Sequence, residues 1–520
     1  MKKQEHDPWI KLVIPSIEPP SLKDNRADVD RLKKGIQKAL QAEEVSFDFL
    51  WSKKIPHLLR EHDYALRPVL YRGRHSWRLI DLFPAHMESS LYGLAVDLGS
   101  STVVIRLLDL IKMEVMGETS FLNPQIEIGA DILTRIHFAS QENGLHRLQK
   151  VLLDRLNEEI RTIANHHGID GRCIVGMSAA GNTAMTHLFL GLDPFQMIRE
   201  PYIPAANRFE LLRADELGIE INPLAPVFIF PNAGSYFGGD LIAGILVSGM
   251  NQQNEVSMLV DVGTNAEVVL GNRDWLMACA GAAGPALEGG VAKMGMMAGP
   301  GVIDRVVIES DTGELSIGMI ADQPPVGICG SGMIDLVAQL FLAGMIDMRG
   351  KFVKERCGER LLDEDGINHF VVVRPEDSGT GEALTLSQPD IDSLLRSKAA
   401  MYTILKTITG MANLSFQEIR HFYVAGTFGT YIDPQSAITI GMIPDLPLKT
   451  YRPLGNSSLE GASRALLSKK ARDEADRIRD RITYIELNVN QEFMNRFSAA
   501  KFIPHTDKTL FPSVRLLGSK

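Results

Sequence analysis

The spacing of apolar residues near the start of the chain predicts helices followed by strands. Four of them recur at intervals of three and four, as on one face of an α-helix: Val29, Leu32, Ile36 and Leu40. A second short helix is expected at 55–60, and two strands at 67–72 and 76–82 on either side of Gly73. Residues 1–90 are therefore predicted to form a small α+β domain.

From residue 91 onward, strand–turn–strand units alternate with helices, which is typical of α/β proteins. Strands are expected at 91–97 and 100–109. Residues 151–167 carry the apolar stripe of an amphipathic helix, and 173–177 read as a buried strand. We therefore expect an α/β architecture for the rest of the chain.

A strand–turn–strand segment occurs twice. Asp97-Leu-Gly-Ser-Ser-Thr-Val-Val aligns with Asp261-Val-Gly-Thr-Asn-Ala-Glu-Val-Val, and 261 − 97 = 164 residues separate the copies. This interval has the size of one α/β half-domain. The repeat predicts two related lobes that face one another across a cleft.

Each Asp-x-Gly-Ser/Thr turn has the chemistry of a phosphate site. Glycine permits backbone torsions that form an anion-sized concavity of N–H groups and short hydroxyls. The aspartate beside it suits Mg²⁺, held through water, because Mg²⁺ dehydrates reluctantly. One such turn is most often only a hairpin. Two copies in register favour Asp97 and Asp261 as catalytic and metal-binding carboxylates around one Mg²⁺–triphosphate.

A third element lies at 419–431, where a predicted strand ends in the small-residue turn Ala425-Gly-Thr-Phe-Gly429. Such a turn lets a flat base lie against the backbone. The order of the three elements resembles the phosphate-1, phosphate-2 and adenosine motifs of the actin, sugar-kinase and heat-shock chaperone ATPase superfamily. The resemblance implies a two-lobed actin-like ATPase domain at 91–520, with duplicated ribonuclease-H-like half-domains at roughly 91–255 and 256–520.

Two further segments resemble the inter-lobe connectors of that superfamily. Gly327-Ile-Cys-Gly-Ser-Gly332, with the apolar helix expected at 333–343, resembles the first connector. Ser397-Lys-Ala-Ala-Met-Tyr402 occupies the place of the second.

A combination of motifs narrows the resemblance to the reductive activators of corrinoid proteins. The motifs are Ala95-Val-Asp-Leu-Gly-Ser-Ser-Thr-Val-Val, Gly181-Asn-Thr-Ala-Met, Asp261-Val-Gly-Thr-Asn-Ala-Glu, Ala283-Gly-Pro-Ala-Leu-Glu-Gly-Gly290, Gly455-Asn-Ser-Ser-Leu-Glu-Gly-Ala462 and Phe502-Ile-Pro-His-Thr-Asp507. They cover nearly all of 91–520, and residues 1–90 resemble the family's middle domain. The family uses ATP to drive electron transfer to a cobalt(II) corrinoid, which restores cobalt(I).

The resemblance and the turn chemistry together give a set of expected ATP-binding residues. These are Gly99, Ser100, Ser101, Thr102, Asn182, Thr183, Gly263, Thr264, Asn265, Glu267, Gly426, Thr427, Phe428 and Gly429. Two of them have other interpretations. Asn182 is also a common helix cap, and Glu267 is either a ligand of metal or water or a polar residue on the second strand.

The four cysteines, Cys173, Cys279, Cys329 and Cys357, are far apart in sequence. They form no Cys-x-x-Cys pair and no plant-type iron–sulfur spacing, so no iron–sulfur cluster is predicted. The best-described family members begin with such a cluster domain, and this chain departs from them. The cysteine pattern favours reduced thiols and a cytoplasmic protein.

The formal charge of −10 argues against a general nucleic-acid binder, and the apolar runs are too short for a membrane helix. The family resemblance implies, as the leading hypothesis, an ATP-dependent activator, an ATPase, that helps restore cobalt(I) in the corrinoid protein of a methyltransferase system. Its electrons would come from a separate carrier, and the resemblance favours a homodimer. A small-molecule kinase and a nucleotide-gated interaction protein remain as alternatives.

Overall fold

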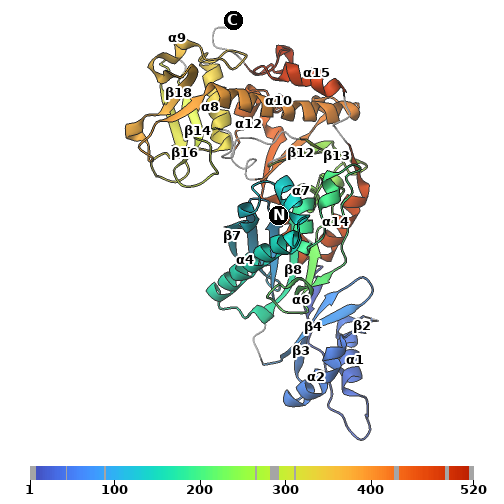
Figure 1. The fold of residues 1–520 in the computed structure, drawn as a ribbon. Coiled ribbons are helices and arrows are strands. Elements are labelled where there is room, and N and C mark those ends of the chain that lie inside the picture. The colour runs from blue at the N-terminus through green and yellow to red at the C-terminus, as the bar shows by residue number, and fades with distance from the viewer. Residues whose placement is uncertain are drawn as a thin grey trace. The chain divides into compact units, whose positions relative to one another are not determined.

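The computed structural model describes residues 7–42, 44–86, 90–263, 266–281, 292–309, 312–426, 432–485 and 491–514. The chain forms two compact units. The first contains Met1–Val247 and Ser457–Asp480, and the second contains Ser248–Asn456 and Arg481–Lys520. Figure 1 shows the elements of each unit along the chain.

The N-terminal part of the first unit has its own sheet and core. Its elements are β1 (Ile10–Leu12), α1 (Asp28–Leu40), β2 (Val45–Ser46), α2 (Phe49–Glu61), β3 (Leu66–Arg72) and β4 (Trp77–Pro84). The strands are ordered β1-β3-β4-β2. Leu32 and Ile36 of α1 pack with Ile55 and Leu59 of α2, and all four side chains are fully buried. The helical spacing seen in the sequence is confirmed here.

The first unit also contains a six-stranded sheet in the order β7-β6-β5-β8-β10-β9. Its strands are β5 (Tyr92–Leu98), β6 (Thr102–Asp109), β7 (Glu114–Leu122), β8 (Ile174–Gly181), β9 (Leu212–Arg213) and β10 (Pro226–Ile229). β5, β6 and β7 are antiparallel neighbours, whereas β8 and β10 extend the sheet in parallel with β5.

The first unit also contains helices from two separate parts of the chain, 132–248 and 457–481. They are α3 (Ile132–Ala139), α4 (Gly144–His166), α5 (Thr183–Leu190), α6 (Ala214–Leu217), α7 (Gly239–Ser248), α13 (Ser457–Leu467) and α14 (Lys469–Arg481). α4 is the amphipathic helix expected from the sequence, and its Leu152, Leu156 and Ile160 enter the core. α13 packs on β5 and β8, where a Cβ atom built on Gly93 would lie 2.9 Å from Leu466 Cδ2.

The second unit repeats the same sheet. Its strands are β11 (Ser257–Val262), β12 (Ala266–Gly271), β13 (Leu276–Gly281), β20 (His421–Ala425), β21 (Tyr451–Gly455) and β22 (Ile482–Tyr484), in the order β22-β13-β12-β11-β20-β21. β11, β12 and β13 are antiparallel, and β20 and β21 continue in parallel with β11. Five strands therefore have the same order and directions in both units, which confirms the duplication inferred from the two turns.

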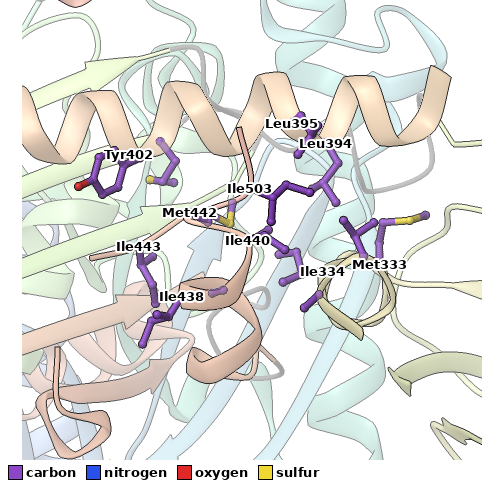
Figure 2. Close-up of a cluster of buried hydrophobic side chains, with 14 of the residues drawn as sticks. Met333, Ile334, Leu394, Leu395, Tyr402, Ile438, Ile440, Met442, Ile443 and Ile503 are labelled. Carbon is purple, nitrogen blue, oxygen red and sulfur yellow. The ribbon is translucent and has the colours of Figure 1, made fainter. Parts of the chain in front are cut away.

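A long insertion separates β13 from β20. It contains β14 (Val302–Ile308), β15 (Leu315–Met319), β16 (Gly327–Ile328), α8 (Gly330–Leu342), α9 (Lys354–Cys357), β17 (Leu361–Glu364), β18 (Ile367–Val373), β19 (Leu384–Ser387) and α10 (Gln388–Met411). α12 (Pro434–Thr439) and α15 (Gln491–Ala500) complete the unit. Figure 2 shows Ile334 of α8, Leu394 of α10, Ile440 and Ile503 meeting in its hydrophobic core.

The two expected connectors are wrong. Residues 327–343 and 397–402 both lie inside the second unit, as β16 with α8 and as the middle of α10. The chain instead passes between the units after Val247, after Asn456 and after Asp480. The glycines at 330 and 332 begin a helix whose residues are nearly all buried, so they serve packing within one unit.

Candidate functional site

The turn between β5 and β6 has a fixed backbone. Asn123 Nδ2 donates to the Gly99 carbonyl at 3.0 Å, and the Asn123 N–H donates to the Ser101 carbonyl at 2.9 Å. Arg135 Nη1 donates to the Ser100 carbonyl at 2.8 Å. These hydrogen bonds anchor three consecutive carbonyl groups of the turn to two other segments of the unit.

Arg135 also places a cation beneath this turn. Its side chain is 1% exposed, and its Nε donates to the Gly129 carbonyl at 2.8 Å. Burial lowers the pKa of Arg135, but a guanidinium remains protonated in proteins. A buried positive charge under a glycine turn favours an anion above it. Sequence reasoning missed Arg135 and Asn123, since both act from segments distant from the turn.

Asp97 is the next-to-last residue of β5 and is half-buried. It lies opposite Val104 in β6 and beside Ala180 in β8. The Thr102 Oγ1 atom, at the start of β6, is buried and has no hydrogen-bond partner among the described residues. An orphaned buried hydroxyl is a group that a phosphate oxygen or an ordered water would satisfy.

Asn182 and Thr183 follow β8 at the same edge of the sheet. Asn182 is the N-cap of α5, and its Oδ1 accepts a hydrogen bond from the Met185 N–H at 2.8 Å. The capping interpretation is therefore confirmed, while the role of Asn182 in nucleotide binding stays a prediction. Thr183 is buried, and its hydroxyl donates to the Gly234 carbonyl at 2.9 Å.

A third acid stands at this edge, and sequence reasoning missed it. Asp240 lies in the first turn of α7, after the loop that follows β10. A Cβ atom built on Gly238 would lie 2.7 Å from Asp240 Oδ1 and 2.4 Å from Asn182 Cα, so the three residues are neighbours. The signal was Phe237-Gly-Gly-Asp240 at the end of the loop that follows a buried parallel strand, because strand carboxyl ends meet at one edge.

In the second unit the corresponding aspartate is Asp261, the next-to-last residue of β11. It lies opposite Glu267 of β12 and beside Ala425 of β20. Gly426, with φ +82°, follows Ala425, and a Cβ there would be 2.9 Å from Asp261 Oδ1. The glycine turn of β20 and the aspartate therefore adjoin one another. Gly263 is described, whereas Thr264, Asn265, Thr427, Phe428 and Gly429 lie outside the described residues.

Both units thus present one arrangement. An aspartate ends the first strand beside Ala-Gly of the parallel fourth strand, Ala180-Gly181 in the first unit and Ala425-Gly426 in the second. Asp261 and Glu267 are directly opposed, and like charges so placed repel unless a cation lies close. Among the described residues, no three His, Cys, Asp or Glu side chains are grouped to hold a metal ion. This chemistry suits a cation that brings its own oxygen ligands, such as water and phosphate.

Three consecutive regions of the chain match regions of one protein family. Residues 1–89 match the RACo linker region, 92–253 the RACo middle region, and 255–515 the C-terminal ASKHA domain of RACo. The chain belongs to the RACo family. The α/β actin-like ATPase fold, preceded by a small domain, is therefore confirmed.

Individual RACo relatives agree with this assignment. The corrinoid activation enzyme RamQ of Eubacterium limosum is 30% identical over 482 residues, which cover 90% of this chain and 79% of RamQ. The [Co(II) methylated amine-specific corrinoid protein] reductase of Methanosarcina barkeri is 25% identical over 446 residues, or 78% of this chain and 76% of the reductase. A solved reductive activator for a corrinoid, iron–sulfur protein superposes with a TM-score of 0.91 at 38% identity, covering 99% of this chain and 82% of that one.

The small N-terminal segment, which was expected to resemble the family's middle domain, matches the RACo linker region instead, and the middle-region match begins at residue 92. The segment's contacts with the rest of the first unit include polar ones: Arg172 Nη2 lies 3.1 Å from both carboxylate oxygens of Asp81, and Asn222 Nδ2 donates to Asp81 at 2.8 Å. In the part of the chain that the structure describes, no helix is long and apolar enough to cross a membrane.

Proposed function

We propose that this protein is an ATP-dependent activator of a corrinoid protein in a methyl-transfer system, and that it helps restore cobalt(I) from cobalt(II). The observation that carries the proposal is a pair of equivalent sites in a RACo-family chain. Asp97 lies beside Ala180-Gly181 in one and Asp261 beside Ala425-Gly426 in the other, and we call them the nucleotide edges. All three relatives described above are named for activating or reducing corrinoid proteins.

The nucleotide part of the proposal assigns Mg·ATP to the two edges. Asp97 and Asp261 orient Mg²⁺ through water, and Glu267 adds negative charge beside Asp261. Asp240 is a further candidate for orienting water near Asn182. The remaining contacts are proposed from the turns: Gly99, Ser100, Ser101, Thr102, Asn182, Thr183, Gly263, Thr264, Asn265, Gly426, Thr427, Phe428 and Gly429.

A separate carrier supplies the electron in this proposal. All four cysteines are free, and three are buried. Burial raises the pKa of Cys279 to about 12 and that of Cys357 to about 11. Since iron–sulfur clusters are ligated by thiolates, these thiols are poor cluster ligands. Four free thiols also fit a cytoplasmic location.

The purified 520-residue chain is expected to carry no iron–sulfur cluster after anaerobic reconstitution with iron and sulfide. The reason is that its cysteines are dispersed and mostly buried as thiols. The check is the visible absorption spectrum together with an iron assay. Stoichiometric iron with cluster absorption would contradict the proposed separate electron donor.

The partner prediction is tested with the corrinoid protein encoded near this protein's gene. The protein is expected to bind the cobalt(II) form in an ATP-sensitive way, because it shifts a cobalt equilibrium only by its difference in affinity for the two states. Each ~1.4 kcal/mol of that difference changes the population tenfold. ATP alone should leave cobalt(II) in place until a low-potential reductant is added. The measurement is a titration followed by cobalt absorption, with and without ATP.

The products formed from ATP, measured alongside that titration, separate the alternatives. Phosphate release stimulated by the corrinoid protein supports the activator. ADP formation that depends instead on a metabolite and yields the phosphorylated metabolite without phosphate release points to a small-molecule kinase. Nucleotide binding without any ADP formation points to a nucleotide-gated interaction protein. Light scattering of the free protein tests the proposed homodimer.

A further inference from the structure

A basic pocket of about 340 Å³ lies in the second unit, and no proposed role accounts for it. Its lining residues are Arg349, Asp392, Leu395, Arg396, Lys501 and Phe502. We call it the α10 pocket, because Asp392, Leu395 and Arg396 belong to α10. Its volume is within the range of small-molecule sites.

The charge of the α10 pocket differs from that of the whole chain. Three cations and one carboxylate line it, while the chain carries −10. The carboxylate is already engaged: Lys351 Nζ lies 3.0 Å and 3.1 Å from the Asp392 oxygens, and Gln388 Nε2 donates to Oδ1 at 3.0 Å. Among the described residues, Arg349, Arg396 and Lys501 form no ion pair. The pocket therefore has an excess of positive charge.

The walls of the α10 pocket are held together by specific contacts. In the turn at 347–351, Gly350 has φ +72°, and a Cβ there would be 2.6 Å from Leu395 Cδ1. The turn therefore packs directly on α10. The third wall of the pocket is the segment with Lys501 and Phe502. The Met348 carbonyl accepts a hydrogen bond from the Ile503 N–H at 2.8 Å, which joins the turn to this segment. Three distant segments are thus locked around one cavity.

Lys398 of α10 holds the third wall in place through hydrogen bonds to its backbone. Its side chain is fully buried, and its amine donates to the carbonyls of Phe502 at 2.5 Å and Pro504 at 2.8 Å. The Gly350 carbonyl also has a donor, Gln388 Nε2, at 2.9 Å. Because these wall carbonyls are occupied by internal donors, the groups that remain for a ligand are mainly the cations.

We propose that the α10 pocket binds a small organic phosphate, with its phosphate group on Arg349, Arg396 and Lys501 and its apolar body against Leu395 and Phe502. Guanidinium forks match phosphate oxygens in bidentate pairs, and two of them beside an ammonium suit a dianion. Arg349, Arg396 and Lys501 are exposed to solvent, so a small anion can reach all three directly. None of the lining residues belongs to either nucleotide edge, so the proposal is independent of the proposed ATP site.

The test is calorimetric titration of the full chain at low salt with phenyl phosphate and with inorganic phosphate. Phenyl phosphate should bind several-fold more tightly, because its ring buries apolar surface on Leu395 and Phe502. Arg396→Ala and Lys501→Ala should each weaken binding about tenfold or more, as expected for a lost charged hydrogen bond. Repeating the titration in Asp97→Ala separates this site from the nucleotide edge, and affinity should be unchanged.

Arg420→Ala is the matched control, because it removes one exposed positive charge from the same unit outside the pocket. It should bind phenyl phosphate like the parent. Thermal unfolding of every variant checks the fold, and Arg349→Gln provides a variant of gentler change. No binding of phenyl phosphate, or equal binding by the parent and the Arg396→Ala/Lys501→Ala double variant, would overturn the proposal. Arginine-dependent binding of a polyglutamate peptide without phenyl phosphate binding would also overturn it, and would assign the pocket to an acidic protein segment.

Discussion

Asp97→Ala and Asp261→Ala are each expected to remove most ATP turnover, by about 10- to 100-fold, the usual loss when a group that orients metal-bound water is deleted. Each aspartate lies at the end of the first strand of its sheet, beside the Ala-Gly of the fourth strand. Both carboxylates are half-buried at the edge of a sheet, so their loss opens no cavity in the core. The thermal unfolding profile should therefore stay near that of the parent. Phosphate release under saturating Mg·ATP is the measurement.

Asp274→Ala is the control for this pair. Asp274 is exposed in the turn between β12 and β13, at the opposite end of the strands from Asp261. The Asp274→Ala substitution removes the same negative charge and should leave ATP turnover unchanged. If Asp97→Ala and Asp261→Ala both hydrolyse ATP at the parent rate, the assignment of the two edges is wrong.

Lys398→Met is expected to change how stability depends on pH. Burial lowers the pKa of the Lys398 amine well below its usual value of 10.5. Between the lowered pKa and 10.5, the unfolded chain binds a proton at this amine that the folded protein does not. Parent stability therefore rises with pH relative to the variant, by about 1.4 kcal/mol per pH unit. For a unit of this size the difference in Tm should grow by about 3–5 °C per pH unit.

Thermal unfolding of the parent and Lys398→Met at several pH values between 7 and 9.5 gives this difference. Subtracting the variant removes the contribution of every other titrating group. Lys501→Met, which changes an exposed lysine nearby, should show no such slope against the parent. A Tm difference between the parent and Lys398→Met that stays constant over this range would show that the buried amine is not the titrating group.

The repeated turns could be predicted because their signals are local. A strand that ends in Asp-x-Gly-Ser/Thr is specified by neighbouring residues. The second copy of this turn, at Asp261, argued against a chance match to a phosphate-binding motif. The strands that flank both turns are confirmed, at β5–β6 and β11–β12. Helix α1 could be predicted in the same way, because the spacing of its apolar residues indicates one buried face.

The connectors were mistaken because glycine-rich segments have several uses. Gly330 and Gly332 belong to the segment that resembled an inter-lobe connector, yet a Cβ on Gly332 would be 2.5 Å from the Ile303 carbonyl oxygen. That contact with β14 is what requires glycine there, and no nearby residue announces it. The three true crossings lie at the end of α7, before α13 and at the end of α14, and carry no comparable sequence signal.

The sequence by itself determined the α/β class, the duplication, the two aspartates and the family resemblance, because each is written in short segments or in their repetition. Only the tertiary structure decided which distant residues support those aspartates. Parallel strands brought Asp240 beside Asn182, and Arg135 came under the first turn from a helix 35 residues away. It also built the α10 pocket from three segments that share no local pattern. The physical reason is that strand order and helix packing are set by burial of the whole core, to which each short segment contributes only a part.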